Sequence, residues 1–269
     1  MLKFCSLYSG STGNSLFIES DNTKILIDSG VSAKKVVDGL SSINVDPNDI
    51  DAILVTHEHS DHIQSLGTIS KKFDIPVYAN KKTWDAMPKQ LEKIDTSNIK
   101  YFDANENFEI NDFIIHPFTI PHDAVDPCGF SFMCDNKKFS IATDLGHMTS
   151  TVMDSLEGSK FVMLEANYDP EVLKCSRYPY ILKARISGPN GHLSNNLAGQ
   201  TVAHLVNCGL ESVTLGHLSK ENNFPELAYN TILEELAISN CPIDSINLNV
   251  ANRDCPTDVL EIGKSLINF

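Results

Sequence analysis

Residues 55–62 read Val-Thr-His57-Glu-His59-Ser-Asp61-His62 and place three histidines and an aspartate in one short stretch, directly after an apolar segment. Neutral imidazoles and a carboxylate oxygen form a set of ligands that suits zinc or a similar divalent ion. The alternative is a polar, solvated turn between a strand and a helix. The number of ligand-type side chains at these spacings favours the metal site.

The flanking sequence indicates how these side chains are presented. Residues 50–56 are apolar and rich in β-branched side chains, as expected of a short buried strand. Ser60 can cap a helix that continues through Leu66 and Ile69. The first two histidines, two positions apart in an extended segment, point to the same side. The aspartate and the third histidine begin the helix and can reach a second position, so the stretch suggests two metal ions.

The rest of the chain alternates between strand and helix patterns, without a linker or a strong internal repeat. Groups of strands flanked by helices in each half predict an α/β fold, with two sheets packed face to face and helices outside. Helices are expected at 32–43, from about 81, and from 195 to about 207. The further predicted strands are 2–7, 15–19, 24–28, 76–79, 113–120, 129–134, 138–142, 161–165, 212–216 and 245–250.

Composition limits the class of protein. The chain has 269 residues, of which 42% are hydrophobic and 21% charged, enough for one sizeable domain or two tightly fused halves. It contains no apolar run long enough to span a bilayer, and its first residues lack the pattern of a signal peptide. The seven cysteines, an odd number without CxxC spacing, read as reduced thiols of a cytoplasmic protein. A net charge of −14 argues against a broadly basic surface for nucleic acid.

Several motifs follow one another in the order of a known family. They are Asp28, the HxHxDH stretch, His122, Asp144 and His217. This order resembles the signature of the metallo-β-lactamase superfamily, whose fold is an αβ/βα sandwich, and it covers nearly the whole chain. The resemblance implies one domain over residues 1–269, with two pseudo-symmetric halves that meet near 135–145. Finer segments resemble the YycJ/WalJ branch, known for exonuclease-like action on DNA. These segments are SGSTGNS (9–15), THEHSDHI (56–63), PHDAVDPCGF (121–130), NGHLSN (190–195) and GHLSKENN (216–223).

The resemblance implies a role for each ligand-type side chain. Asp28 would brace the metal-binding loop through hydrogen bonds, although a helix cap or a turn aspartate is the ordinary alternative. Asp61 would orient the attacking hydroxide in addition to binding metal. One ion would be bound by His57, His59 and His122, the other by Asp61, His62 and His217, and Asp144 would bridge the two.

The local sequence supports these assignments and leaves alternatives open. His122, Asp144 and His217 each follow a predicted strand, where a rigid element can hold a ligand. Taken singly, the two histidines could be loop residues and the aspartate a helix cap. His116 lies inside a predicted strand and is expected to be packed or at the surface. His147 could approach the site, although a cap role is favoured.

The charge of such a site indicates its substrate. Two divalent ions with neutral histidines, two aspartates and a bridging hydroxide give a net charge of about +1, which favours an anion. Ions roughly 3.5–4 Å apart can orient the hydroxide for in-line attack on phosphorus. We therefore predict a dinuclear phosphodiester hydrolase, with zinc or manganese and with iron as a further option. The resemblance to the YycJ/WalJ branch implies that it is a 5′-to-3′ DNA exonuclease. The alternatives are a lactone, thioester or β-lactam hydrolase on the same fold, and a non-catalytic, metal-dependent interaction protein.

His192 is the residue that we expect to serve phosphodiester cleavage. It precedes Ser194, a predicted N-cap, and a helix that runs to about Asn207. A phosphate near that helix start would meet free backbone N–H groups and a favourable dipole. The arrangement resembles the His-plus-helix element of ribonuclease Z, whose histidine contacts the scissile phosphate or assists the leaving group. A histidine in an ordinary turn before a helix is the alternative.

A basic strip beside this histidine offsets the acidic surface. Its charges suit phosphates and its rings suit bases, although an ordinary solvated loop fits as well. The strip consists of Lys174, Arg177, Lys183 and Arg185, with Tyr178 and Tyr180 between them. In the turn at 9–14, Ser11 and Asn14 are further candidates for a phosphate contact, or parts of a plain hairpin turn. Tyr168 stands where the branch is expected to carry histidine, which leaves the substrate preference open.

Overall fold

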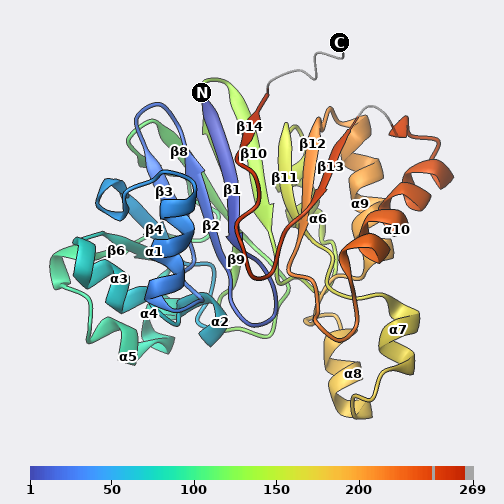
Figure 1. Ribbon diagram of the computed structural model, residues 1–269, viewed down its shortest axis with the longest axis horizontal. Helices are drawn as coiled ribbons and strands as arrows, with labels where there is room; N and C mark the ends of the chain where they lie inside the picture. The colour runs from blue at the N-terminus through green and yellow to red at the C-terminus, as the bar shows by residue number, and fades with distance from the viewer. Residues whose placement is uncertain (244–245, 264–269) are drawn as a thin grey trace.

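Two seven-stranded sheets pack face to face in the computed structural model, which describes residues 1–243 and 246–263 (Figure 1). The first sheet contains, in spatial order, β14 (Leu260–Ile262), β1 (Leu2–Tyr8), β2 (Ser15–Glu19), β3 (Lys24–Ile27), β4 (Ala52–Leu54), β5 (Val77–Ala79) and β6 (Ile99–Tyr101). Neighbouring strands from β14 to β3 are antiparallel. From β3 to β6 they are parallel, so these strands end at the same edge of the sheet.

The second sheet repeats this division into an antiparallel and a parallel part. In spatial order it contains β13 (Asn247–Val250), β12 (Ser212–Gly216), β11 (Phe161–Glu165), β10 (Lys137–Ala142), β9 (Cys128–Cys134), β8 (Phe113–Thr119) and β7 (Phe108–Ile110). Strands β10 to β13 are parallel, and β7 to β10 are antiparallel. The chain changes sheets between β6 and β7, and β14 returns to the first sheet.

Helices cover the outer face of each sheet (Figure 1). The first sheet is covered by α1 (Ala33–Ser42), α3 (Leu66–Phe73) and α4 (Lys81–Ala86), with α5 (Pro88–Leu91) beside α3. The second is covered by α6 (Ser150–Leu156), α9 (Asn195–Asn207) and α10 (Pro225–Ile238). At the lower edge in Figure 1 lie α2 (Ser60–Ile63), α7 (Pro170–Cys175) and α8 (Tyr180–Ile186). Short 3-10 turns lie at η1 (Pro47–Asp49) and η2 (Thr96–Asn98).

Aromatic side chains fill the space between the sheets. Phe4 of β1 packs against Phe161 of β11 with ring centroids 4.5 Å apart. Within the second sheet, Phe132 stacks on Phe139 at 4.8 Å. All four rings are buried, and full burial of one such side chain stabilises a fold by roughly 1.5–3 kcal/mol. This packing fixes the two sheets against each other, and with them the edge at which the strands of both sheets end.

The predicted α/β architecture is confirmed. Each predicted strand is present with bounds within two residues of the expected ones, apart from Ser245, which lies outside the described residues. The helix expected at 32–43 is α1, and Ser32 is its N-cap. The predicted strands do not include β6, β7 and β14, because three residues carry too little periodic signal. The division into two halves near 135–145 stays a prediction.

The prediction of a single helix after Ser60 is wrong. Two short helices, α2 and α3, occupy this stretch, and the N-cap of α2 is His59 rather than Ser60. The carbonyl of His62 accepts a hydrogen bond from Ser29 N–H at 2.8 Å, and Ser65 N–H donates to the Ser29 carbonyl at 2.9 Å. These bonds use backbone groups that a continuous helix would pair internally. The break therefore fixes His62 to the loop that follows β3.

The cysteines and the helices show whether the chain has disulfide bonds or membrane spans. All seven cysteines have free thiols, as predicted. Four of them are buried, so they act as small apolar side chains of the core. Among the described residues, no helix combines the length and the apolar character that crossing a membrane requires.

Candidate metal centre

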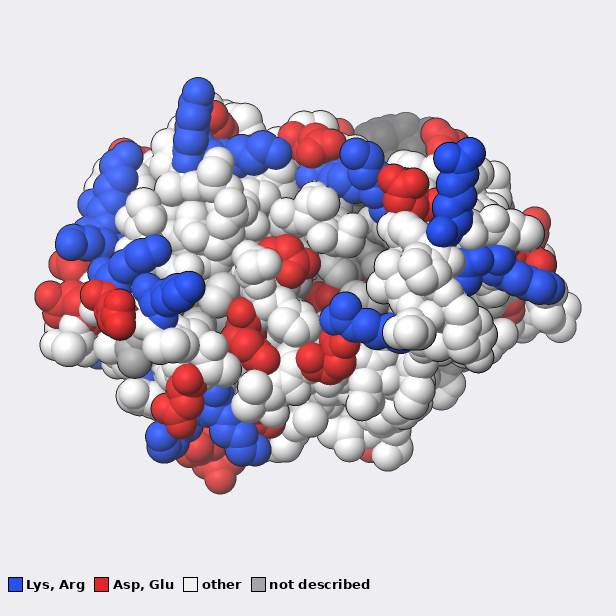
Figure 2. Space-filling model, turned by 90° about the horizontal axis from the view of Figure 1, so that it is seen from below, with Lys and Arg blue, Asp and Glu red and all other residues white. Residues whose placement is uncertain are grey.

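The predicted ligands lie together at one edge of the two sheets, although they come from four separate parts of the chain. The HxHxDH stretch follows β4 of the first sheet, whereas His122, Asp144 and His217 follow β8, β10 and β12 of the second. Because strands of both sheets end here, each side chain starts from a rigid element. Figure 2 looks onto this edge and shows acidic side chains near the middle and basic ones mainly around it.

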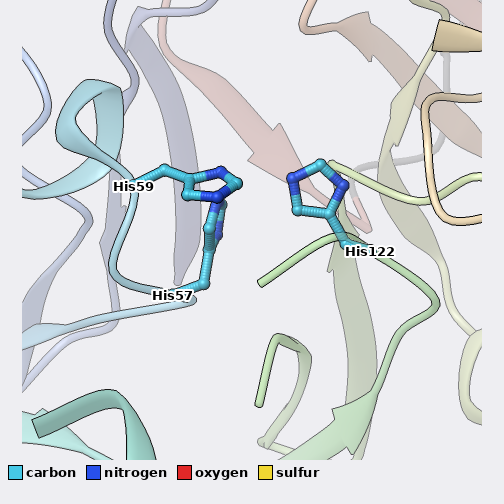
Figure 3. A group of neighbouring side chains, drawn as sticks. All are labelled: His57, His59 and His122. Carbon is cyan, nitrogen blue, oxygen red and sulfur yellow. The ribbon is translucent and has the colours of Figure 1, made fainter. Parts of the chain in front are cut away.

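His57, His59 and His122 form the first triad, and their rings face one another across the gap between two loops (Figure 3). The ring centroids of His57 and His59 are 4.6 Å apart, and each lies 5.1 Å from that of His122. His57 Nδ1 lies 3.0 Å from Thr56 Oγ1, and His122 Nδ1 lies 3.1 Å from the Gly191 carbonyl. Contacts at Nδ1 orient these two rings so that Nε2 is presented to the shared space.

Asp61, His62 and His217 form the second triad. Asp61 Oδ2 lies 3.6 Å from His62 Nε2 and 3.9 Å from His217 Nε2. On its other side, His62 Nδ1 lies 2.7 Å from Asp28 Oδ2. Asp28 also accepts hydrogen bonds from the backbone N–H and the hydroxyl of Thr56, at 2.9 and 2.8 Å. Asp28 thus connects the end of the HxHxDH strand to the ring of His62, which is the geometry that a bracing residue needs.

Asp144 lies between the two triads. Its Oδ2 is 3.2 Å from His62 Nε2, and its Oδ1 is 3.8 Å from His122 Nε2 and 3.3 Å from His217 Nδ1. The side chain is buried. It does not cap the helix that follows, because Thr149 is the N-cap of α6. Asp144 therefore occupies the position that a bridging ligand would need.

The backbone of three centre residues is left-handed. The φ angles are 62° at Asp28, 60° at Asp144 and 56° at His217. Such angles are uncommon for residues other than glycine and cost of order 1–3 kcal/mol where the surroundings impose them. The backbone of Gly30 lies so close to that of Asp61 that only glycine fits, since a Cβ at this position would be 1.6 Å from the carbonyl oxygen of Asp61. The sharp turns after the strands thus direct polar side chains back toward the sheet edge.

Glu165, at the end of β11, belongs to the centre although the sequence does not predict it. Its Oε1 accepts hydrogen bonds from His192 Nδ1 and His217 Nδ1, both at 2.8 Å. Its Oε2 accepts from the backbone N–H groups of Leu145 and Leu193, at 2.9 and 3.0 Å. One buried carboxylate therefore orients two histidines. Its place at the end of a predicted strand, like the other centre residues, is the signal that could have identified it.

Burial and charge act against each other on the titratable groups of the centre. Burial, with the neighbouring His62, lowers the pKa of His57 well below its ordinary value. Burial also opposes protonation of His62 and His217, but the negative charge of Asp144 outweighs it. The pKa of His62 is raised well above its ordinary value, with Asp28 contributing, and that of His217 is raised to about 10. Burial opposes ionisation of Asp144, yet these histidines hold its pKa well below the ordinary value. The buried carboxylates therefore favour positive charge beside them.

The donor atoms of the centre fit a divalent metal ion. Three buried ligand atoms have no hydrogen-bond partner among the described residues, namely His57 Nε2, His217 Nε2 and Asp144 Oδ2. An unpaired buried polar atom costs roughly 1–3 kcal/mol. Each of these residues belongs to a group of ligand atoms within 4.8 Å of one another, and imidazole nitrogens with carboxylate oxygens are common ligands of zinc and manganese. Cations bound in the two triads would satisfy all three atoms.

His192 lies beside the centre. Its ring centroid is 5.3 Å from those of both His122 and His217. Its side chain is 22% exposed, so that it is accessible from outside while Nδ1 is held by Glu165. Burial opposes protonation of His192, but the charge and the hydrogen bond of Glu165 outweigh it and raise the pKa. His192 therefore has one nitrogen committed to the protein and the other free of that contact.

Helix α9 begins where the sequence predicts, with Ser194 as its N-cap. The expectation that its first N–H groups are free is wrong in part. Asn195 N–H donates to the Tyr168 carbonyl at 2.9 Å, and Leu197 N–H donates to Ser194 Oγ at 3.3 Å. The start of α9 is thus fixed to the loop that follows β11, and it offers a phosphate fewer donors than the sequence suggests.

The turn at 9–14 lies against the second triad. Asn14 is buried, its Oδ1 accepts the N–H of Gly10 at 3.0 Å, and its Nδ2 lies 3.1 Å from His62 Nε2. Ser11 is exposed in the same turn. Asn14 therefore supports the turn and contacts a predicted ligand, whereas a contact of either residue with substrate stays a prediction.

The predicted basic strip lies on α7 and α8 and between them. Arg185 Nε donates to Asp123 Oδ2 at 2.6 Å, and Asp123 follows His122 directly. Lys183 is half-buried and Arg177 is exposed. Tyr168, which stands where histidine is expected, is buried. Their contacts with substrate also stay predictions.

The two competing histidines lie away from the groups of ligand atoms in the part of the chain that the structure describes. His116, in β8, contacts Asn107 Oδ1 at 2.8 Å. His147 is exposed, and its Nδ1 lies 2.8 Å from the Pro189 carbonyl. The helix-cap role favoured for His147 is wrong, because Thr149 fills that position.

This fold, with two such triads at one edge of two sheets, is that of a metal-dependent hydrolase. The sequence profile of the metallo-beta-lactamase superfamily matches residues 8–197, and the chain belongs to this superfamily. Within it, the chain falls in the WalJ/YycJ branch, as its motifs predict. It is 41% identical to exodeoxyribonuclease WalJ of Streptococcus pneumoniae over 87% of this chain and 88% of that protein. It is 37% identical to exodeoxyribonuclease YycJ of Bacillus anthracis over 87% and 89% of the two chains.

A solved structure supports the fold assignment independently. The metallo-beta-lactamase fold protein YhfI of Bacillus subtilis matches 96% of this chain and 100% of its own, with a TM-score of 0.69. The two sequences are 16% identical, so this likeness concerns the fold alone. The αβ/βα sandwich implied by the motifs is confirmed.

Proposed function

We propose that this chain is a metal-dependent exodeoxyribonuclease that hydrolyses the phosphodiester bonds of DNA in the 5′-to-3′ direction. The observation that carries the proposal is the position of Asp144 between two ligand triads, with His192 beside them. Similarity to two exodeoxyribonucleases over 87% of the chain supports DNA as the substrate. The free thiols of all seven cysteines support a cytoplasmic enzyme.

In this proposal each ligand keeps the role that the family implies. Zinc or manganese fits a set of imidazoles and carboxylates, and iron is a further option. When bound, two such ions lower the pKa of water and stabilise negative charge on the phosphoryl group. Asp61, whose side chain is 26% exposed, can contact the attacking water as well as an ion. One ion is assigned to His57, His59 and His122, the other to Asp61, His62 and His217, and both to Asp144.

His192 is assigned to the leaving group. Glu165 accepts a hydrogen bond from Nδ1, which fixes the proton there and leaves Nε2 to face the substrate. Although burial opposes protonation of His192, the charge and the hydrogen bond of Glu165 raise its pKa. From Nε2 this ring can donate a proton to the departing oxygen or a hydrogen bond to the phosphate.

The proposal is tested by nucleotide release from internally labelled DNA, single- and double-stranded, with manganese or zinc. Oligonucleotides blocked at the 5′ or the 3′ end report the direction, and a lactone serves as a neutral substrate. We expect release that a chelator abolishes and added metal restores, and that a 5′ block slows. Lactone turnover without DNA cleavage would identify an ester hydrolase instead. Metal binding without turnover of either substrate would identify an interaction protein.

A further inference from the structure

A pocket of about 700 Å³ lies between α7 and α8. Pockets of this size are typical of sites for small organic ligands. Helix α8 buries none of its residues, and Tyr180 and Ile181 are 84% and 82% exposed. In Figure 2 the protruding region of α7 and α8, on the right, is largely uncharged at its tip and has basic side chains on its flanks. Large exposed apolar side chains on a protrusion indicate a surface that meets a ligand.

The C-terminal end of α8 is fixed to the metal centre. His192 N–H donates to the Ile186 carbonyl at 2.8 Å. A Cβ at Gly191 would lie 2.2 Å from the carbonyl oxygens of Arg185 and Ile186, so only glycine permits this approach. Arg185 Nε, in turn, is 2.6 Å from Asp123 Oδ2, the neighbour of the ligand His122. The helix that lines the α7–α8 pocket is therefore attached to the loops that carry His122 and His192.

Tyr168 belongs to the pocket and follows the strand that ends at the centre. Its ring lines the α7–α8 pocket and is buried. It follows Glu165 by three residues, and its carbonyl accepts the N–H of Asn195 at the start of α9. The residue that replaces the expected histidine thus forms part of this pocket.

The lining combines rings with positive charge. Tyr168, Tyr178 and Tyr180 contribute aromatic surface, Lys174 and Lys183 contribute charge, and Glu171 is the acidic residue of the lining. Two lysines against one glutamate give a local charge of +1, on a chain whose net charge is −14. Lys183 Nζ donates to the Lys174 carbonyl at 2.6 Å, which holds its ammonium group at the pocket. Aromatic faces beside lysines suit a nucleotide, with a base for the ring and a phosphate for the charge.

We propose that the α7–α8 pocket binds one nucleotide of the DNA strand that enters the metal centre. Its base stacks on the tyrosine rings, and its phosphate lies near Lys183. Because such stacking tolerates any base, the pocket holds the strand without selecting a sequence. This inference rests on the proposed nuclease function and adds a binding subsite to it.

The test uses Tyr180→Ala in the full-length, manganese-loaded enzyme, with Tyr229→Ala on α10 as the matched control. Tyr180 is 84% and Tyr229 38% exposed, and neither belongs to a hydrophobic core cluster. KM and kcat are measured on a DNA oligonucleotide and on bis(p-nitrophenyl) phosphate, which has no base. For Tyr180→Ala we expect the ratio of kcat/KM on DNA to that on the small diester to fall about tenfold, mainly through KM for DNA. Tyr229→Ala should keep the wild-type ratio.

Abasic substrates locate the nucleotide. Oligonucleotides that lack one base at successive positions from the degraded end are compared on wild type and Tyr180→Ala. We expect one position at which base removal raises KM about tenfold for wild type and adds little for the variant. An unchanged DNA-to-diester ratio in Tyr180→Ala, or no sensitive position, would overturn the pocket assignment and leave the nuclease proposal intact. If wild type hydrolyses neither substrate with metal, the proposed function itself fails.

Discussion

The metal centre and the α7–α8 pocket are adjacent and are built in opposite ways. Five of the seven predicted ligands are buried, and two of their rings are held by further residues, His62 by Asp28 and His217 by Glu165. Helix α8 buries none of its residues and is fixed mainly at its C-terminal end. The comparison suggests that the centre determines the reaction and the pocket determines how the polymer is held.

This difference predicts where mutations act. A change in the centre should alter metal binding and affect every substrate alike, because all of them need the same ions. A change on α8 should leave the metal content as it is and affect DNA more than a small diester. The predictions that follow test this separation, from the largest expected effect to the smallest.

The largest effect is expected for Asp144→Ala. Because Asp144 contacts both triads, its loss should reduce metal loading and lower activity on DNA and on a small diester to background. Metal analysis after gel filtration and both kinetic assays measure this. Asp154→Ala, at an exposed position of α6, is the matched control. Full metal loading in Asp144→Ala would contradict the bridging role.

His192→Ala should keep the metals and slow DNA cleavage by roughly 10²–10⁴-fold, the range for loss of a positioned acid or base. The comparison is with His116→Ala, which removes a histidine of β8 that contacts Asn107. Metal content and kcat are determined for both. If His192→Ala turned over DNA at the wild-type rate, His192 would have no part in the reaction.

Glu165→Gln should have an intermediate effect. The amide has the shape of the carboxylate but lacks its negative charge, so it binds the two imidazole N–H groups more weakly. His192 and His217 would both lose their orientation. Loss of such an outer partner costs about 10–100-fold in metal affinity or activity. Competition with a chelating dye gives the metal affinity, and Glu234→Gln on α10 serves for comparison. An unchanged affinity together with unchanged kcat would limit Glu165 to a structural role.

Arg185→Ala should have a smaller effect, confined to DNA. With metal content unchanged, we expect KM for DNA to rise several-fold. If Arg185 contacts one phosphate, the slope of log affinity against log salt should decrease by about 0.7–0.9. Lys81→Ala is the matched control, because Lys81 also forms a surface ion pair, with Asp85. A loss of metal in Arg185→Ala would mean that the two regions are not separable.

The smallest effect on function is expected for Asp112→Asn, at a position outside both regions. Burial opposes ionisation of Asp112, but hydrogen bonds from Thr23 and Ser20 outweigh it and lower its pKa. A lowered pKa in the folded state adds stability above the ordinary value of 3.8, and this stability disappears as the pH falls through the folded-state value. The difference in free energy of unfolding between wild type and variant should therefore shrink below about pH 4. Urea unfolding between pH 3 and 7 measures it, and a constant difference would contradict the assignment.

The sequence predicts those parts of the site whose residues are closely spaced in the chain or follow a regular apolar pattern. The HxHxDH stretch is recognisable by itself, and long apolar runs define most of the strands whose ends meet at the centre. Glu165 shares with the other centre residues only its position at the end of a strand. A single glutamate there carries no spacing to a partner, and its contacts join residues 27 and 52 positions away. Contacts between distant segments also explain the broken helix after His59 and the occupied N–H groups at the start of α9. These features depend on tertiary hydrogen bonds, which local propensity does not contain.

The protruding α8 is a further feature that the sequence does not predict. The sequence marks its basic and aromatic residues, but the same composition describes an ordinary loop. Only the fold shows that Ile186 and Gly191 bring this segment against the metal centre.

The ligands on the HxHxDH stretch start from one sheet, and His122, Asp144 and His217 start from the other. Ions held by both sets would cross-link the two layers at their common edge. In the unfolded chain, such a link would close a loop from His57 to His217, and closing a long loop restricts the chain considerably. We therefore expect metal to protect the protein from degradation as well as to activate it. The rate of limited proteolysis with and without a chelator would measure how far the lifetime of the protein depends on the supply of metal.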